Sequence, residues 1–156
     1  MTLLYVIRHG ETDYNRNGRY QGQSDVPLNA EGRSQCRALT ARMSAIPLDV
    51  VYTSDLSRAQ ECARMIAGAR TVLLDTRLRE VNVGRCTGLT VAEIAAREPA
   101  FYVSLKTDPD STPFPGGESA HDLLGVTDGS RRGELDDLHA GPVPHLPVRG
   151  CKPAGE

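Results

Sequence analysis

The sequence predicts a single α/β domain in which a mostly parallel sheet is flanked by helices in three layers. Short continuous apolar runs, typical of strands buried on both faces, alternate with segments of helical periodicity. Each apolar run ends in a polar, turn-rich cluster. A length of 156 residues favours one domain with a substantial core.

The first predicted strand covers residues 3–7 (LLYVI), a continuous apolar run. It ends abruptly at residues 8–10, Arg-His-Gly, and turn-rich sequence follows as far as residue 28. Asn29 can cap a helix that begins near Ala30, because its side chain can accept a hydrogen bond from the first helical turn. The apolar side chains that recur on one face of this helix are those of Cys36, Leu39 and Met43.

The second predicted strand covers residues 48–52 and leads into a helix over residues 56–67. Gly68 ends that helix, and residues 71–74 (TVLL) form the third predicted strand.

A further helix is predicted from a capping-box pattern, in which Thr90 is followed three residues later by Glu93. This helix should continue to Arg97 and stop before Pro99, because the residue before a proline disfavours the helical conformation.

The composition changes after Leu124. Residues 125–156 contain six glycines and four prolines and no aromatic residue, and helical or strand periodicity is absent. We therefore expect residues 1–124 to form the α/β domain and residues 125–156 to be an irregular tail. Two explanations of this tail stay open: it is a genuine divergent ending, or a reading-frame change near Leu124 replaced the original one.

The charge and cysteine content exclude several classes of function. A net charge of −2 provides no basic field to recruit nucleic acid or an anionic membrane, so an anionic ligand should be small and held locally. The four cysteines are scattered, without metal-ligand spacing, and are expected to be reduced thiols. No apolar stretch is long enough to span a bilayer. We expect a cytoplasmic protein that uses no metal or cofactor.

The residues at the three strand ends suggest phosphate chemistry. His9 follows the first strand beside Arg8, Arg58 follows the second, and Glu80 follows the third. In an open α/β sheet, ligands bind outside the carboxyl ends of the strands. A neutral imidazole can attack phosphorus while a guanidinium holds the phosphoryl oxygens, and a carboxylic acid can protonate the leaving oxygen.

Three motifs in order carry a resemblance to a known family: R-H-G-E-T-D-x-N from Arg8, S-D-L-x-R-A from Ser54, and L-R-E from Leu78. The later run Pro-Gly-Gly-Glu-Ser at residues 115–119 matches a further element. Over roughly residues 1–124 the chain resembles the histidine phosphatase (phosphoglycerate mutase-like) superfamily, and within it the phosphatase branch.

The resemblance implies metal-independent hydrolysis of a small phosphomonoester through a phosphohistidine on His9, with Glu80 as the proton donor. It implies that Arg8, Asn15, Arg58 and a second histidine surround the phosphate. Gln21 and Gly22 match positions that line the pocket in the phosphatase branch. The sequence makes no prediction of the physiological substrate or of the oligomeric state.

The chain departs from the family in its last motif, a Val- and Ile-rich strand that ends in His-Gly. None of His121, His139 and His145 follows an apolar strand, and His121 falls in a helix that Ser119 would cap. Because the missing strand is expected to be central in the sheet, its neighbours would expose unpaired backbone groups. Two alternatives therefore remain beside a phosphatase: a phosphoglycerate mutase, or a protein that binds phosphate without turnover.

Overall fold

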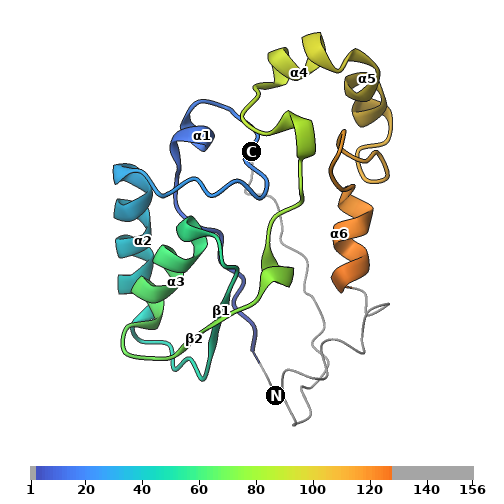
Figure 1. Cartoon of the computed structure of the whole chain (residues 1–156). Coiled ribbons are helices and arrows are strands. Elements are labelled where there is room, and N and C mark those ends of the chain that lie inside the picture. The colour runs from blue at the N-terminus through green and yellow to red at the C-terminus, as the bar shows by residue number, and fades with distance from the viewer. Residues whose placement is uncertain (1–2, 128–156) are drawn as a thin grey trace, which may run out of the picture.

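The computed structural model describes residues 3–127, and these residues form a mixed α/β structure (Figure 1). One group of elements combines α2, α3, β1 and β2, and a second group contains α4 and α5. In chain order the elements are α1 (Asp13–Arg16), α2 (Ala30–Met43), β1 (Val51–Thr53), α3 (Ser57–Ala67), β2 (Val72–Leu74), the 3₁₀ turns η1 (Thr76–Leu78) and η2 (Gly84–Cys86), α4 (Val91–Arg97), α5 (Pro99–Thr107) and α6 (Ala120–Thr127).

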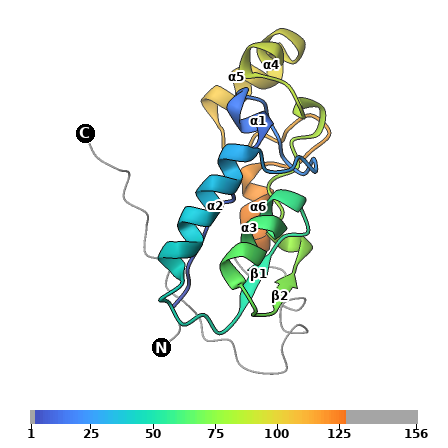
Figure 2. The ribbon, with the colours of Figure 1, turned by 90° about the vertical axis from the view of Figure 1, so that its left-hand side faces the viewer.

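Strands β1 and β2 pair in parallel and are joined through α3, so they form a βαβ unit. Val51 lies opposite Val72 in this pairing. Helix α3 packs against both strands and against α2, as Figure 2 shows. The second and third predicted strands are therefore confirmed, although both are shorter than expected and β1 begins three residues later than predicted.

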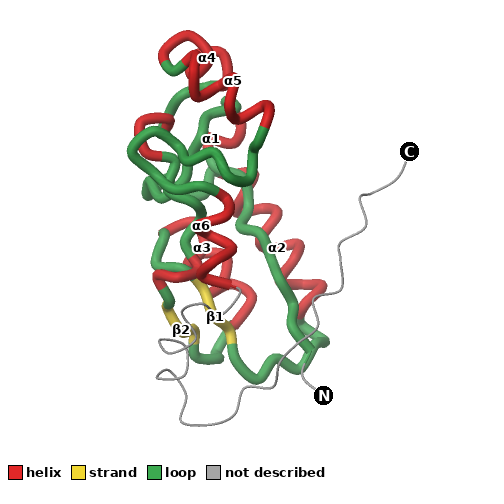
Figure 3. The backbone as a smooth tube through the Cα atoms, turned by 90° about the vertical axis from the view of Figure 1, so that its right-hand side faces the viewer, coloured by secondary structure: helices red, strands yellow, loops and turns green. Residues whose placement is uncertain are grey.

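The predicted first strand is wrong for the described residues, because residues 3–7 belong to no strand. Their apolar side chains are exposed: Leu3 at 67%, Leu4 at 63% and Val6 at 88%. The segment runs along α2 in Figures 2 and 3. A strand exists only through hydrogen bonds to a neighbouring strand, and no strand within residues 3–127 pairs with this run.

Helix positions agree more closely with the sequence, because their signals are local. Helix α2 starts as predicted, and the Asn29 side chain accepts a hydrogen bond from Gly32 N at 2.8 Å. The capping box of Thr90 and Glu93 is present at the start of α4. Two helices were not expected: α1, and α5, in which Pro99 occupies the first turn, where its missing N–H is no loss.

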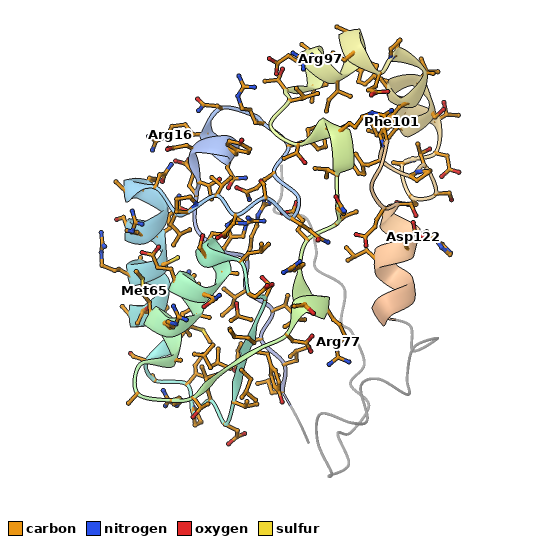
Figure 4. All side chains as sticks on the ribbon, viewed as in Figure 1. Arg16, Met65, Arg77, Arg97, Phe101 and Asp122 are labelled. Atoms are coloured by element: carbon orange, nitrogen blue, oxygen red, sulfur yellow. The ribbon has the colours of Figure 1, made fainter. Side chains whose placement is uncertain are left out.

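Most buried apolar side chains of the described residues fall into two clusters, marked in Figure 4 by the nearby Met65 and by Phe101. The first joins α2 to α3 and contains Leu28, Cys36, Met43, Cys62 and Ile66. The second lies under α4 and α5 and contains Val83, Cys86, Ile94 and Phe101. The candidate site residues lie in the loops between the two groups and in the first turn of α3.

None of the helices within residues 3–127 is both long and apolar enough to cross a membrane.

Cys36, Cys62 and Cys86 are buried free thiols. The predicted irregular tail lies, from residue 128 onward, outside the described residues, and so do His139, His145 and Cys151.

Candidate active site

The backbone around His9 is held by the first turn of α2. A Cβ atom on Gly10 would lie 2.3 Å from the carbonyl oxygen of Gly32, and one on Gly32 would lie 2.0 Å from that of Glu11. The N–H of Asn29 also donates to the Glu11 carbonyl at 3.0 Å. Only glycine allows this approach at both positions, so the first turn of α2 sets the place of the His9 loop.

The hydrogen bonds of His9 define its tautomer. Its Nδ1 lies 2.7 Å from the carbonyl oxygen of Gly10, which can only accept, so Nδ1 carries the hydrogen. Nε2 then carries a lone pair, and this lone pair accepts a hydrogen bond from Nε of Arg58 at 3.1 Å. A neutral imidazole with its Nε2 lone pair directed away from the backbone is suited to attack an electrophilic phosphorus.

The electrostatic surroundings favour this neutral state. Burial lowers the pKa of His9 below its ordinary value, and the positive charges of Arg58 and Arg8 lower it further. The hydrogen bond to Gly10 and the charge of Glu80 act in the opposite direction without reversing the shift.

Arg58, near the N-terminus of α3, is 1% exposed. Its Nη1 donates to the carbonyl of Ser24 at 2.6 Å, and its Nη2 donates to that of Gly22, also at 2.6 Å. Burial lowers the pKa of the guanidinium, although an arginine remains charged at neutral pH. The site therefore contains a desolvated cation that touches the candidate nucleophile directly.

Gly22 lets its loop lie close to residues 81–83, which follow β2. Its φ of +52° is in the left-handed region, and a Cβ atom there would lie 2.6 Å from a methyl group of Val83. The glycine therefore serves both the close packing and the carbonyl that holds Arg58.

Glu80 forms an ion pair with Arg58, in which Glu80 Oε2 lies 3.4 Å from Arg58 Nη2. The Glu80 side chain is 47% exposed. The preceding residue, Arg79, forms an ion pair with Asp55, which lies two residues after the end of β1. This pairing with Arg79 lowers the pKa of Asp55. The ion pair ties the loop of Glu80 to the end of the neighbouring strand.

Gln21 is 4% exposed and is oriented by Thr12, whose hydroxyl lies 2.6 Å from Gln21 Oε1. Its Nε2 donor is buried and has no hydrogen-bond partner among the described residues. A buried donor without a partner costs free energy, and an anionic oxygen would satisfy it. This donor precedes Gly22 in the chain and is a candidate ligand-binding group.

Thr12 was missed as a site residue by the sequence analysis, although it is fully buried. Its hydroxyl and backbone N–H both lie within hydrogen-bonding distance of Asn15 Oδ1, in the capping box that starts α1. The signal that could have found it is the spacing Thr-x-x-Asn, which is a variant of the capping box. Thr12 thereby links Gln21 to Asn15.

The predicted site residues thus fall into three groups. His9, Arg58, Glu80 and Gly22 are joined by direct contacts through Arg58. Asn15 and Gln21 are joined to each other through Thr12. Arg8 is exposed and forms no hydrogen bond or ion pair with the part of the chain that the structure describes, although its charge acts on His9.

His121 does not belong to these groups. It lies on α6, where its side chain is exposed and its backbone N–H donates to the carbonyl of Asp110 at 2.8 Å. The neighbouring Asp122 appears on the opposite side of the view from α2 and α3 (Figure 4). Within residues 3–127, no second histidine contacts His9, Arg58 or Glu80.

Comparison with protein families gives a match over residues 4–125 to the histidine phosphatase superfamily (branch 1). Phosphoglycerate mutase-like protein 4 of Arabidopsis thaliana is 38% identical over 125 residues, which cover 78% of this chain and 54% of that protein. Phosphoserine phosphatase 1 of Hydrogenobacter thermophilus is 35% identical over 121 residues, which cover 76% of this chain and 57% of that protein.

Among solved structures, the mycobacterial glucosyl-3-phosphoglycerate phosphatase in complex with VO₃ aligns with a TM-score of 0.72 and 35% identity. The alignment covers 86% of this chain and 66% of that chain. The fold is accordingly the three-layer α/β fold of the phosphoglycerate mutase-like proteins. The chain spans little more than half the length of the curated relatives that it matches.

Proposed function

Because the chain belongs to the histidine phosphatase superfamily (branch 1), we propose that it hydrolyses a small phosphomonoester through a phosphohistidine on His9, without a metal ion. We assign this chemistry to the α/β domain of residues 1–124. Of the expected tail of residues 125–156, residues 125–127 are the end of α6. Two relatives that carry phosphatase names support hydrolysis as the reaction.

In the first step, Nε2 of His9 attacks the phosphorus and the bond from phosphorus to the ester oxygen breaks. In its protonated form, Glu80 would give its proton to that departing oxygen, so the alcohol would leave neutral. In the second step, Glu80 takes a proton from a water molecule whose oxygen attacks the phosphohistidine. Inorganic phosphate leaves, and His9 and Glu80 return to their starting states.

Positive and polar groups would hold the transferred phosphoryl group, since phosphoryl transfer depends chiefly on positioning and on charge around three equatorial oxygens. We assign this role to the guanidinium groups of Arg8 and Arg58 and to the side-chain amides of Asn15 and Gln21. Gly22 would support these phosphate-binding groups through its backbone carbonyl, which accepts a hydrogen bond from Arg58 and orients it. The unpartnered Nε2 of Gln21 is the donor most in need of an anionic ligand.

The observation that carries the proposal is the environment of His9. Its Nδ1 is bonded to a backbone carbonyl at 2.7 Å, its Nε2 lone pair meets a buried guanidinium at 3.1 Å, and its pKa is lowered by burial. An ordinary surface histidine needs none of these features. Together they supply a neutral, oriented nucleophile beside a cation.

The test is an assay of the purified chain with an aryl phosphate between about pH 5 and pH 8, the range in which histidine titrates. The parent should release phosphate and form an acid-labile phosphoryl adduct, and His9→Ala should do neither. His121→Ala is the matched control, because His121 lies exposed on α6, and it should behave as the parent. Turnover that survives in His9→Ala would refute the proposal.

A mutase is the second candidate, favoured by the relative that is named phosphoglycerate mutase-like. A mutase returns its phosphoryl group to an acceptor and needs a phosphorylated enzyme to start. Steady phosphate release without a bisphosphorylated activator would exclude it. Phosphoryl transfer to phosphoglycerate without net release would establish it instead.

A third candidate is a protein that binds phosphate without turnover, favoured by the absence of a second histidine contact at His9 within residues 3–127. Loss of one cation from the phosphate-binding groups would raise the barrier to phosphoryl transfer by about 3 kcal/mol. Vanadate binding to the folded parent without any phosphoryl adduct would support this candidate over the phosphatase.

A further inference from the structure

The loop that carries Glu80 is attached to the rest of the molecule on both sides of that residue. On the N-terminal side, Arg79 pairs with Asp55 at the end of β1. On the C-terminal side, the backbone of Asn82 is held by Glu118, which lies 36 residues further along the chain. Glu80 and Val81 are the two residues between these attachments.

Glu118 holds Asn82 at two points. The backbone N–H of Asn82 donates to Glu118 Oε2 at 2.8 Å, and the backbone N–H of Glu118 donates to the Asn82 carbonyl, also at 2.8 Å. The Asn82 side chain in turn accepts from Gly84 N at 3.0 Å. Both polar groups of the Asn82 backbone are thus satisfied by one residue of a distant turn.

That turn is closed by a hydrogen bond of its own and packs closely against the loop of Asn82. Phe114 N donates to the Glu118 carbonyl at 3.0 Å. A Cβ atom on Gly117 would lie 2.1 Å from the Asn82 carbonyl oxygen, and one on Gly84 would lie 2.3 Å from that of Pro115. Gly117 and Gly84 allow the turn of residues 114–118 to approach the loop of Asn82 closely.

The side chain of Glu80 has little support of its own. Its carboxylate is 47% exposed and meets Arg58 at 3.4 Å, with no other hydrogen-bond partner within residues 3–127. Its location therefore depends on the backbone that carries it. A displaced Asn82 would move Glu80 relative to Arg58 and His9.

We propose that Glu118 is a positioning residue that holds the backbone of Asn82 so that the Glu80 carboxyl faces the oxygen leaving from phosphorus. This inference rests on the proposed role of Glu80 as proton donor. A shift of about 1 Å in a catalytic group is enough to cost a large factor in rate.

The experiment compares two substrates of different leaving-group basicity in Glu118→Ala. An alkyl phosphate needs its leaving oxygen protonated, whereas a nitrophenyl phosphate needs this far less. In Glu118→Ala, kcat/KM should fall by about tenfold to a hundredfold for the alkyl phosphate and by much less for the nitrophenyl phosphate. Glu118→Gln keeps an acceptor for Asn82 N–H and should restore most of the alkyl phosphate activity.

Glu98→Ala is the matched control, because Glu98 forms an exposed ion pair with the nearby Arg85 and no hydrogen bond or ion pair with residues 79–83. It should leave the ratio of the two rates unchanged. Equal losses for both substrates in Glu118→Ala, or no loss at all, would overturn the inference, since a merely structural role makes no distinction between leaving groups.

A binding measurement separates failure of this inference from failure of the proposed function. Vanadate mimics the transferred phosphoryl group, so its affinity is measured for Glu118→Ala, Glu80→Gln and the double variant. If Glu118 acts through Glu80, the double variant should bind vanadate as weakly as Glu80→Gln alone. Additive losses overturn the positioning role, whereas a parent that neither binds vanadate nor turns over refutes the proposed function and this inference with it.

Discussion

At the scale of single residues, His9 links the site to the pH dependence of stability. Burial, Arg58 and Arg8 lower the pKa of His9 in the folded chain, while in the unfolded chain it has its ordinary value of about 6.5. Between these two values the unfolded state binds a proton that the folded state does not.

The parent should therefore lose free energy of unfolding relative to His9→Gln as the pH falls below about 6.5, and the difference should level off below the lowered pKa. Above the ordinary value the difference should not depend on pH. Urea unfolding of both proteins over this range measures it. If the free energy of unfolding of the parent relative to His9→Gln were constant with pH, or rose as the pH falls, His9 would not be buried in its neutral form.

Gln21 provides a second prediction at this scale. Its Nε2 is buried without a partner among the described residues, so Gln21→Met should leave the free energy of unfolding unchanged or raise it by about 1 kcal/mol. The same change should weaken vanadate binding, because the donor for the anion is lost. Thr12 keeps Asn15 as an alternative acceptor at 3.0 Å.

Gln23→Met is the control for this experiment, since Gln23 lies in the same loop and forms no hydrogen bond with the described residues. It should change neither quantity. If Gln21→Met bound vanadate as tightly as the parent, Gln21 would not be one of the phosphate-binding groups.

At the scale of elements, α2 determines where the His9 loop lies. The close approach of Gly32 to Glu11 predicts that Gly32→Ala destabilises the fold by about 1–3 kcal/mol, although alanine favours helices. The new Cβ would overlap a backbone oxygen, which cannot move without displacing the loop. Chemical denaturation measures the loss, and activity should fall with it.

Ser34→Ala tests whether the effect is specific to this contact. Ser34 is an exposed residue of α2 in the next turn, and its substitution should change the free energy of unfolding by less than about 0.5 kcal/mol. If Gly32→Ala were as stable as the parent, α2 would not be pressed against the His9 loop in solution.

At the scale of the whole molecule, the exposed apolar run of residues 3–7 is the feature that most affects behaviour in solution. Continuous exposed apolar surface binds hydrophobic dyes and promotes association. Val6 is 88% exposed, so Val6→Lys should reduce dye binding and association while changing the free energy of unfolding by less than about 0.5 kcal/mol.

Dye fluorescence and light scattering, with denaturation of the same samples, check this outcome. Ile66→Lys is the contrasting variant, because Ile66 is 9% exposed in the cluster between α2 and α3 and its replacement should unfold the chain. A large loss of stability in Val6→Lys would mean that residues 3–7 are covered in solution.

The tail of residues 125–156 belongs to the same scale. We hold to the hypothesis that a reading-frame change near Leu124 replaced the original ending, because the composition changes abruptly there. The match to the family also ends at residue 125. An uninterrupted frame in the coding DNA of several independent isolates would contradict it.

The sequence by itself determined the α/β class, the order of the three motifs, the start of α2 and the capping box of α4. The two helix features depend on neighbours within about four residues, since helical hydrogen bonds and caps are local. Pro99 shows the limit of local reasoning: it ended one helix as predicted and also began the next.

Only the tertiary structure decided that residues 3–7 stay unpaired, that Arg58 is held by the carbonyls of Gly22 and Ser24, and that Glu118 holds the loop of Glu80. The partner of a strand, of a buried guanidinium or of a loop amide comes from a distant part of the chain. Its identity depends on how the elements pack, and no local sequence pattern contains that information.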